Sequence, residues 1–266
     1  MQFAIVNNQR TAPSPGLPGF CPACGGPVIA KCGEQRIHHW AHRGERDCDH
    51  WWEPETEWHR NWKNAFPEEW QEVVQRDSNG EKHIADVRTA QGLTIEFQHS
   101  HLRSEERAAR ENFYGAMVWV VDGHRVGGDL PRFREGARAL RLIDKGLYLH
   151  QFPDELFPKK WLNGKVPVYF DFHNVSSPAD LQVPEKRSLW CLLPRRDRSY
   201  AAILKIARET FIRIAIEKPK LLLWQSIPAK ADQWLNAQRQ RAAQMYLRDE
   251  LERRRRWWRA HPRSRY

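Results

Sequence analysis

The sequence predicts a mixed α/β fold, chiefly because of the order of the elements expected between residues 51 and 122. That stretch reads as a helix, three strands, a second helix and a fourth strand. A cysteine- and histidine-rich stretch precedes it, and a basic, mainly helical pattern ends the chain. We therefore expect four regions: an N-terminal strand and metal-binding module in residues 1–50, an α/β core in 51–122, a small β-containing accessory region in 123–197 and a basic helical region in 198–266.

Composition narrows the class of protein. The chain has 266 residues and a formal net charge of +10, which favours a polyanionic partner such as nucleic acid. No apolar run is long enough to span a membrane, and the first residues lack the basic-then-apolar pattern of a signal peptide. We therefore expect a cytoplasmic protein without a membrane span. Five cysteines in such a chain do not indicate a disulfide framework.

The first region contains a pattern typical of a structural zinc site. Cys21 and Cys24 are separated by two residues and followed by two glycines, which let backbone amides approach the sulfurs. His39 and His42 would complete a tetrahedral site with two thiolates and two imidazoles. The spacing differs from that of DNA-reading fingers, so it predicts structural zinc and not base recognition. It leaves other nearby ligands open, namely Cys48, His38 and His50.

A helical pattern covers residues 51–66. Pro54 suits a first helical turn, and the acidic residues directly after it favour a helix start. Apolar residues at four-residue steps form one face: Trp58, Trp62 and Phe66. A polar row at the same step lies on an adjoining face: Glu55, His59 and Lys63. This row is either a solvated ion-pair face or a row that faces a metal site, and the spacing does not decide between them.

Three strands are expected next, in residues 70–76, 83–88 and 93–98. A turn signal at residues 77–80 indicates a hairpin between the first two. Asp86 lies on the second strand, and Glu96 and Gln98 share one face of the third. Carboxylates on neighbouring strands would bind a hard divalent ion such as Mg²⁺ or Mn²⁺. A solvated sheet face would show the same alternation, so this stretch alone does not establish a site.

A second helix and a buried strand complete the core. Ser104 and the acidic residues after it begin a helical pattern that ends near Gly115. Residues 117–121 are apolar throughout, which is typical of a strand buried on both faces. We expect this strand to lie parallel to the one in residues 93–98, through a right-handed crossover.

This order of elements resembles the PD-(D/E)XK nuclease superfamily and, within it, the CoiA-like competence-protein family. The resemblance covers roughly residues 20–122. Its motifs follow one another along the chain: Cys21-Pro22-x-Cys24, His39-Trp40-Ala41-His42, Glu55-Thr56-x-x-His59-x-x-x-Lys63, Ala85-Asp86-Val87, Ile95-Glu96-Phe97-Gln98-x-Ser100, Arg110-x-x-x-Tyr114 and Met117-Val118-Trp119-Val120. One position departs from the superfamily, because Gln98 stands where its members carry a lysine.

The resemblance implies a restriction-endonuclease-like αβββαβ core with an N-terminal zinc knuckle, and metal-dependent cleavage of phosphodiester bonds. Asp86 and Glu96 would hold Mg²⁺ or Mn²⁺, with the carbonyl of Phe97 as a further ligand. Gln98 can orient a water molecule, but it lacks the charge with which a lysine would stabilise the transition state.

Residues on the two helices are expected to assist. Lys63 or His59 would supply the positive charge that Gln98 lacks. Glu55 would bind a second metal ion or orient water. Arg110 and Tyr114 would either contact the substrate phosphate or pack their helix against the sheet.

The rest of the chain is less informative. Apolar runs in residues 161–193 indicate strands, the pattern in 200–217 is helical, and another helix runs from Pro228 towards the C-terminus. From Trp234 onward ten arginines stand against three acidic residues. This segment is either a solvated helix or an arm that tracks phosphates and stacks on single-stranded bases. The residues of such an arm would be Arg253, Arg254, Arg255, Arg256, Trp257 and Trp258.

Two functions follow from these patterns. The first is a metal-dependent deoxyribonuclease in DNA uptake, recombination or defence against foreign DNA, acting on single-stranded or branched DNA among its substrates, with a recombinase or helicase as a partner protein. The second is a catalytically silent, zinc-containing DNA-binding protein on a nuclease fold. Clustered Asp86, Glu96 and Glu55 favour the nuclease, because their mutual repulsion makes sense if a cation lies between them. Gln98 keeps the silent binder open.

Overall fold

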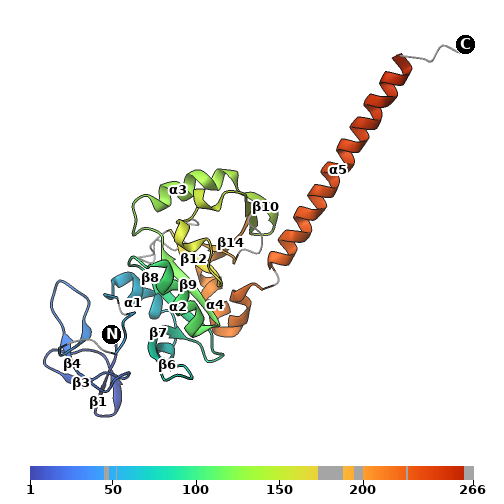
Figure 1. The fold of residues 1–266 in the computed structure, drawn as a ribbon. Coiled ribbons are helices and arrows are strands. Elements are labelled where there is room, and N and C mark those ends of the chain that lie inside the picture. Colours follow the sequence, from blue (N-terminus) through green and yellow to red (C-terminus); the bar gives the residue numbers. More distant parts are fainter. Residues whose placement is uncertain (45–47, 52, 173–187, 195–199, 226, 261–266) are drawn as a thin grey trace, which may run out of the picture. The chain divides into compact units, whose positions relative to one another are not determined.

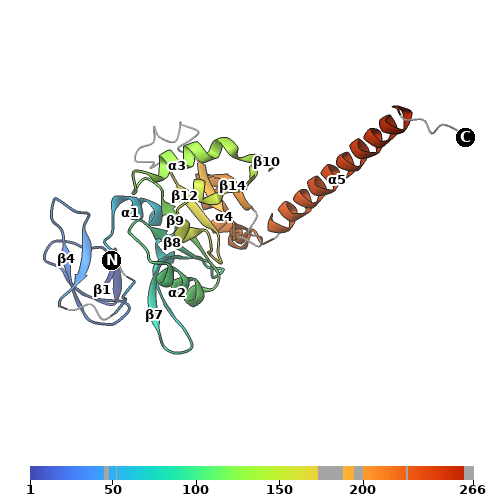
Figure 2. The same ribbon diagram turned by 45° about the horizontal axis from the view of Figure 1, so that its top comes forward.

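The computed structural model describes residues 1–44, 48–51, 53–172, 188–194, 200–225 and 227–260. The chain divides into two compact units, Met1–Gln225 and Ser226–Tyr266. The first unit contains a five-stranded sheet near the N-terminus and a nine-stranded sheet (Figures 1 and 2). In the second unit, the described residues form one long helix, α5 (Ile227–Ala260).

The small sheet is antiparallel throughout, in the order β2-β1-β3-β4-β5. Its strands are β1 (Ala4–Val6), β2 (Gln9–Thr11), β3 (Pro18–Phe20), β4 (Pro27–Lys31) and β5 (His39–His42). Trp40 is buried, and its indole Nε1 donates a hydrogen bond to the carbonyl of Thr11 at 2.9 Å. The sequence predicts one strand in the first 20 residues, but the structure has three, because β2 and β3 are too short to show an alternating pattern.

The large sheet has the order β10-β11-β14-β13-β12-β9-β8-β7-β6. The pairs β8–β9 and β9–β12 are parallel and the other neighbours are antiparallel. Its strands are β6 (Gln71–Arg76), β7 (Lys82–Arg88), β8 (Thr94–Gln98), β9 (Met117–Asp122), β10 (Arg141–Asp144), β11 (Leu147–His150), β12 (Val168–Asp171), β13 (Ser188–Leu192) and β14 (Ala201–Ala207).

The elements predicted for the core are confirmed in position. Strands β6 to β9 match the four predicted strands to within a residue at either end, and the second predicted helix is α2 (Ser104–Tyr114). The predicted parallel pairing is also confirmed, with Glu96 opposite Trp119. The first helix, α1 (Glu57–Lys63), is shorter than predicted. The hydroxyl of Thr56 accepts a hydrogen bond from the backbone N–H of His59 and so begins the helix after Glu55.

Helices α1 and α2 cover opposite faces of β8, which explains why every residue of this strand is buried. On one face the ring of Phe97 stacks on Trp62 of α1, with 5.5 Å between centroids. On the other face Glu96 contacts Arg110 of α2. Successive residues of a strand point to opposite faces, so the two contacts place the helices on either side.

Two predictions for the second half of the chain need correction. The sequence predicts a helix over residues 200–217, whereas residues Ala201–Ala207 form the strand β14 and the helix α4 (Arg208–Glu217) begins after it. Pairing with β13 on one side and β11 on the other outweighs the helical preference of these residues. The strands expected in a separate accessory region, residues 123–197, instead extend the core sheet, because β12 pairs directly with β9.

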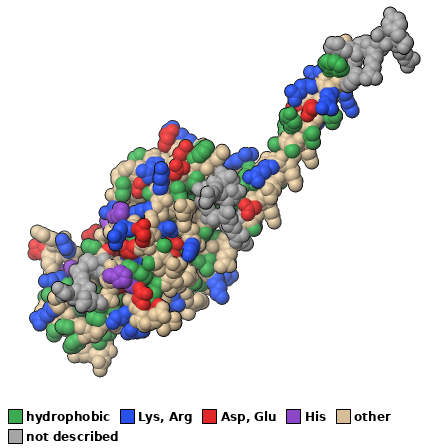
Figure 3. All heavy atoms as spheres, in the orientation of Figure 1, with side chains coloured by type: hydrophobic (Ala, Val, Ile, Leu, Met, Phe, Trp, Pro, Cys, Tyr) green, Lys and Arg blue, Asp and Glu red, His purple; other side chains and the backbone are tan. Residues whose placement is uncertain are grey.

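The remaining helices lie in the connections or at the C-terminus. Helix α3 is Asp129–Gly136, and short 3-10 helices cover Glu68–Trp70, Ala137–Ala139, Pro153–Glu155, Lys159–Trp161 and Pro219–Leu223. No helix among the described residues is both long enough and apolar enough to cross a bilayer. On the face of the first unit drawn in Figure 3, acidic and basic side chains are interspersed and no large basic patch is seen.

Candidate functional site

Four side chains of the N-terminal module lie close enough together to share one metal ion. The ligand atoms of Cys21, Cys24, His42 and Cys48 all lie within 4.8 Å of one another. Cys24 Sγ is 3.4 Å from His42 Nε2, and Cys21 Sγ is 3.7 Å from Cys48 Sγ. Three thiolates and one imidazole form a donor set that suits tetrahedral zinc. The module can therefore hold a structural metal ion such as zinc.

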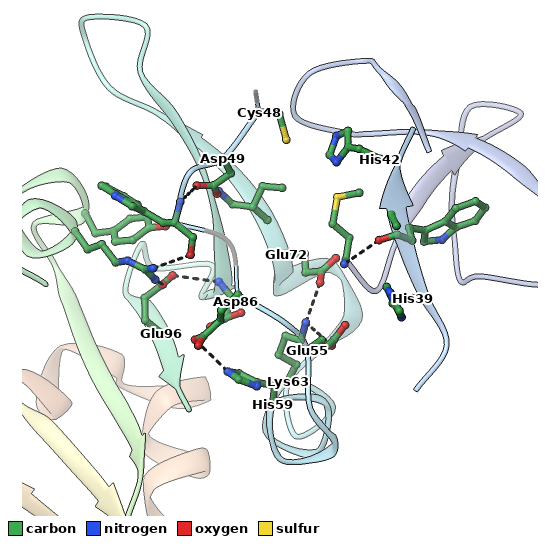
Figure 4. Close-up of a pocket in the computed structure, with 18 residues that line it drawn as sticks. His39, His42, Cys48, Asp49, Glu55, His59, Lys63, Glu72, Asp86 and Glu96 are labelled. Atoms are coloured by element: carbon green, nitrogen blue, oxygen red, sulfur yellow. Dashed lines mark hydrogen bonds and ion pairs between the residues drawn. The ribbon is translucent and has the colours of Figure 1, made fainter. Parts of the chain in front are cut away.

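His39 is not in this group, which corrects the predicted use of both histidines. His39 and His42 stand three positions apart on β5, and residues an odd number apart on a strand point to opposite faces. His39 Nδ1 instead lies 2.9 Å from the carbonyl oxygen of Ile37. Figure 4 shows His42 next to Cys48 and His39 at the other end of the strand. The alternative ligand Cys48 takes the fourth position.

The backbone around the two nearby cysteines is arranged to support thiolates. Gly25 has a φ of +72°, and the turn brings the N–H of Ala23 and of Gly26 to 3.4 and 3.3 Å from the sulfurs of Cys21 and Cys24. Burial raises the pKa of the Cys21 and Cys48 thiols. A cation among these sulfurs would offset that effect and favour their thiolate forms.

The second group of functional side chains lies where β7 and β8 separate. These strands pair at Val87↔Ile95 and Arg88↔Thr94. At the next pair of positions, side chains take over from the backbone ladder: the N–H of Asp86 donates to Glu96 Oε1 at 3.2 Å, and the N–H of Phe97 donates to Asp86 Oδ2 at 2.9 Å. The two carboxylates predicted to bind a metal are therefore adjacent, as Figure 4 also shows.

Both carboxyl groups resist ionisation. Burial, together with the charge of Asp86, raises the pKa of Glu96 to about 8, although Arg110 lies 3.2 Å away and opposes this. Burial also raises the pKa of Asp86, against the charges of Lys63 and His59. A divalent cation placed between the two groups would remove the electrostatic cost of ionising both.

Glu53 belongs to the site although the sequence does not single it out. Its Oε1 lies 3.3 Å from His59 Nε2, and its Oε2 accepts hydrogen bonds from the N–H of Ser100 at 2.9 Å and from Gln98 Nε2 at 3.2 Å. Glu53 precedes the helix and therefore has no place in a helical period. Its position just before Pro54, in a stretch otherwise read as helix start, is the one local signal for it.

His59 lies beside the two metal-binding candidates. Its Nε2 is 2.9 Å from the carbonyl oxygen of Phe97, which can only accept a hydrogen bond, so Nε2 carries a proton. Burial lowers the pKa of His59, but hydrogen bonding to Glu53 and the charge of Asp86 outweigh it and raise the pKa overall. The Phe97 carbonyl, predicted as a metal ligand, is thus occupied by this hydrogen bond.

Gln98 is buried and does not line the cavity at the site. Its amide Nε2 donates to Glu53 and to the carbonyl of Ser100 at 3.1 Å. Its Oε1 is buried without a hydrogen-bond partner among the described residues. In this arrangement Gln98 holds Glu53 in place and does not itself face the two carboxylates.

Lys63 faces the cavity but is tightly paired. Its Nζ lies 2.7 Å from Glu55 Oε1 and 2.8 Å from Glu72 Oε1, and its side chain is 3 % exposed. Glu55 also forms a two-point ion pair with Arg60, at 2.8 and 2.9 Å. These cations lower the pKa of Glu55 despite its burial. The predicted row Glu55, His59 and Lys63 therefore does line the cavity, with two of its three members joined in an ion pair.

The cavity between the module and the core sheet is strongly acidic. About 90 Å³ of it is open to the centres of water molecules, which is room for several waters or a hydrated ion. Six carboxylates line it, against the permanent cations Lys63 and Arg110: Asp49, Glu53, Glu55, Glu72, Asp86 and Glu96. Among the described residues, Asp86 is the lining carboxylate that forms no ion pair. Its charge is therefore free to bind an added cation.

The remaining predicted residues have distinct surroundings. Arg110 is buried, and its guanidinium donates to Glu96, to Glu106 and to the carbonyl of Trp51. Tyr114 is buried and lines the cavity. These contacts match the packing alternative for Arg110 better than direct binding of a substrate phosphate.

The predicted arm lies on α5. Arg253, Arg254, Arg255 and Arg256 are exposed, and Trp257 is 54 % exposed, whereas the side chain of Trp258 lies outside the described residues. Arg254 and Arg256 lie near Glu250 and Glu252, at 3.1 and 3.7 Å. Exposed pairs of this kind are weak and leave the basic charge of the segment available.

A mixed α/β protein with a Cys₃His module and an acidic cavity is thus the class that fold and site define. Residues 18–50 match the family model described as the N-terminal domain of competence protein CoiA. The match covers the strand β3, the knuckle, β5 and Cys48, and it supports the resemblance to the CoiA family. No curated protein and no solved structure matches the chain.

Proposed function

We propose that the protein is a metal-dependent deoxyribonuclease of the PD-(D/E)XK type, which hydrolyses phosphodiester bonds in DNA. The observation that carries the proposal is the pair Asp86 and Glu96, adjacent on two separating strands in a cavity with room for a hydrated ion. The order of elements from α1 to β9 and the basic charge of the chain agree with it. The likeness to the CoiA N-terminal domain favours a role in DNA uptake, with recombination or defence as the alternatives.

The pair Asp86 and Glu96 would hold Mg²⁺ or Mn²⁺, because hard oxygen ligands suit these ions. When bound, the ion supplies Lewis-acid activation of water and stabilises the leaving oxygen. Arg110 holds Glu96 by a contact of 3.2 Å, and the backbone N–H of Phe97 holds Asp86, so both carboxylates are oriented before an ion binds. Their second oxygens are the ones offered to the cavity.

His59 is the residue that best replaces the missing lysine. Its Nε2 carries a proton and lies close to Glu53, and the charge of Asp86 raises its pKa. A protonated His59 would balance the negative charge that develops on the phosphate. Glu53, held by Gln98 and Ser100, would orient the imidazole and the attacking water. Lys63 is less suited to this task, since its charge is already shared by two carboxylates.

The test is cleavage of linear, circular and single-stranded DNA with Mg²⁺ or Mn²⁺, comparing the wild type with Asp86→Asn and Glu96→Gln. Each substitution should lower the rate by about 100-fold or more, because the ion would lose a ligand. Glu105→Gln, which changes an exposed carboxylate at the start of α2, is the matched control and should cleave normally. Cleavage that survives Asp86→Asn unchanged would overturn the proposal.

A catalytically silent DNA-binding protein is the second candidate, favoured by the locked state of Lys63 and by Gln98. In that case the wild type would bind DNA but release no product at any concentration of Mg²⁺ or Mn²⁺. Asp86→Asn would then leave DNA binding unchanged, since no ion would be needed at the cavity.

A further inference from the structure

A second group of metal-binding side chains lies near the turn end of the β6–β7 hairpin. Nitrogen and oxygen atoms of His50, Glu81 and His83 all lie within 4.8 Å of one another. None of the three lines the acidic cavity, and none belongs to the Cys₃His group. We infer that these three side chains form a separate site for a divalent transition-metal ion, with zinc as the expected occupant.

The donor atoms are already spaced for an ion. His83 Nε2 lies 2.8 Å from Glu81 Oε1. Donors about 2.1 Å from a metal lie roughly 3.0 to 3.4 Å apart in octahedral or tetrahedral geometry, so a small movement suffices. Two imidazoles and one carboxylate suit zinc better than Mg²⁺, which prefers oxygen ligands alone. Three protein ligands also leave a coordination position for water.

A carboxylate behind His83 orients the ring for this role. His83 Nδ1 lies 2.8 Å from Asp49 Oδ1, which accepts its proton and leaves Nε2 directed at Glu81. Asp49 is itself fixed, because it accepts hydrogen bonds from the backbone N–H of Ile84 at 2.9 Å and of Trp51 at 3.0 Å. A carboxylate that supports a metal-binding histidine in this way fixes the tautomer and strengthens the ligand.

The site combines one rigid ligand with two accessible ones. His83 is 1 % exposed, and its ring stacks on Trp51 with 3.3 Å between centroids and an angle of 11°. The edge contact with Phe113 restricts it further. His50 and Glu81 are exposed, so an ion can enter from solvent and these side chains can adjust to it. The buried ligand sets the position and the exposed ligands complete the coordination.

Without a metal, the simplest account of His83 is an imidazolium held between Asp49 and Glu81. That account gives His50 no part, although the His50 and His83 rings lie 5.1 Å apart. Metal binding uses all three side chains. An ion here would tie the β6–β7 hairpin to the segment that carries Cys48, and so would link the hairpin to the zinc module.

The experiment measures zinc bound per chain by equilibrium dialysis and elemental analysis. All proteins carry Asp86→Asn, so that the acidic cavity does not bind a further ion and the result does not depend on the proposed nuclease activity. His50→Ala and Glu81→Gln should each bind one zinc ion fewer than the parent. His101→Ala, which removes an exposed histidine outside the site, is the control and should bind as many as the parent.

Two further measurements separate this site from the cysteine module. With Co²⁺, the thiolate charge-transfer absorption should stay unchanged in His50→Ala and Glu81→Gln, which shows that the module is intact. Asp49→Asn should weaken zinc binding at the second site by about 10- to 100-fold, because it removes the support of His83. Equal zinc content in the parent, His50→Ala and Glu81→Gln would overturn the inference and leave His83 as an ion-paired histidine.

Discussion

Lys63 stabilises the fold more than it assists chemistry, and Lys63→Met tests this. Methionine keeps the apolar stem but removes the ammonium group that lies 2.7 Å from Glu55 and 2.8 Å from Glu72. Glu72 would be left as a buried anion without a cationic partner, since Glu55 still has Arg60. Breaking a buried pair by removing one partner costs about 3–5 kcal/mol. For a unit of this size that lowers the melting temperature by roughly 10 °C.

The assay is urea unfolding of the zinc-loaded protein, followed by tryptophan fluorescence. Arg60→Met is the matched control, because Arg60 pairs with the same Glu55 but is partly exposed, and it should cost about 1 kcal/mol. Adding Glu72→Gln to Lys63→Met should recover part of the loss, since no unpaired carboxylate then remains. A loss for Lys63→Met no larger than that for Arg60→Met would refute the reasoning. Its folded fraction should retain cleavage, whereas His59→Gln should lose it.

Three further results are expected. Removing zinc with a chelator should lower the melting temperature of the wild type but not of Cys24→Ser, which already lacks a ligand of the module; equal effects on both would count against the Cys₃His site. Burial raises the pKa of Asp171 to about 6 in the folded state, against 3.8 for the free group, so its protonated form stabilises the fold below pH 4 and this contribution is lost as pH rises through 6. Asp171→Asn should therefore remove a fall of up to about 3 kcal/mol in unfolding free energy across that range, and an unchanged pH slope would contradict it. Truncation after Gln233 should weaken DNA binding and reduce its salt dependence by up to about 3.5 units of log–log slope, whereas an unchanged slope would rule out the arm.

The predictable part of this molecule is local. Strands β6 to β9 and helix α2 were fixed by hydrophobic alternation, turn residues and caps, all of which act over a few residues. Strand β14 was misread because its residues, AAILKIA, suit a helix, and its pairing with β11 and β13 depends on segments far away in the sequence. The same limit explains Glu53, whose partners His59 and Ser100 lie on other elements.

The zinc ligands illustrate a different limit. The spacing of His39 and His42 suits one face of a helix, but on a strand it directs the two rings to opposite sides. The correct fourth ligand, Cys48, approaches Cys21 across 27 positions of sequence. Motif spacing therefore identified the metal module, but secondary structure was needed to choose among its ligands.

The charges of the cavity distinguish residues that support the fold from residues that support chemistry. Lys63 satisfies Glu72, Arg110 satisfies Glu96 and His59 satisfies Glu53, so removing any of these cations should destabilise the protein. Asp86 has no such partner among the described residues, and its charge raises the pKa of Glu96. Asp86→Asn should therefore leave the metal-free protein as stable as the wild type or more stable, because it removes that repulsion. A carboxylate that costs the fold stability and yet is the one free to bind a cation is best explained by a metal-dependent function.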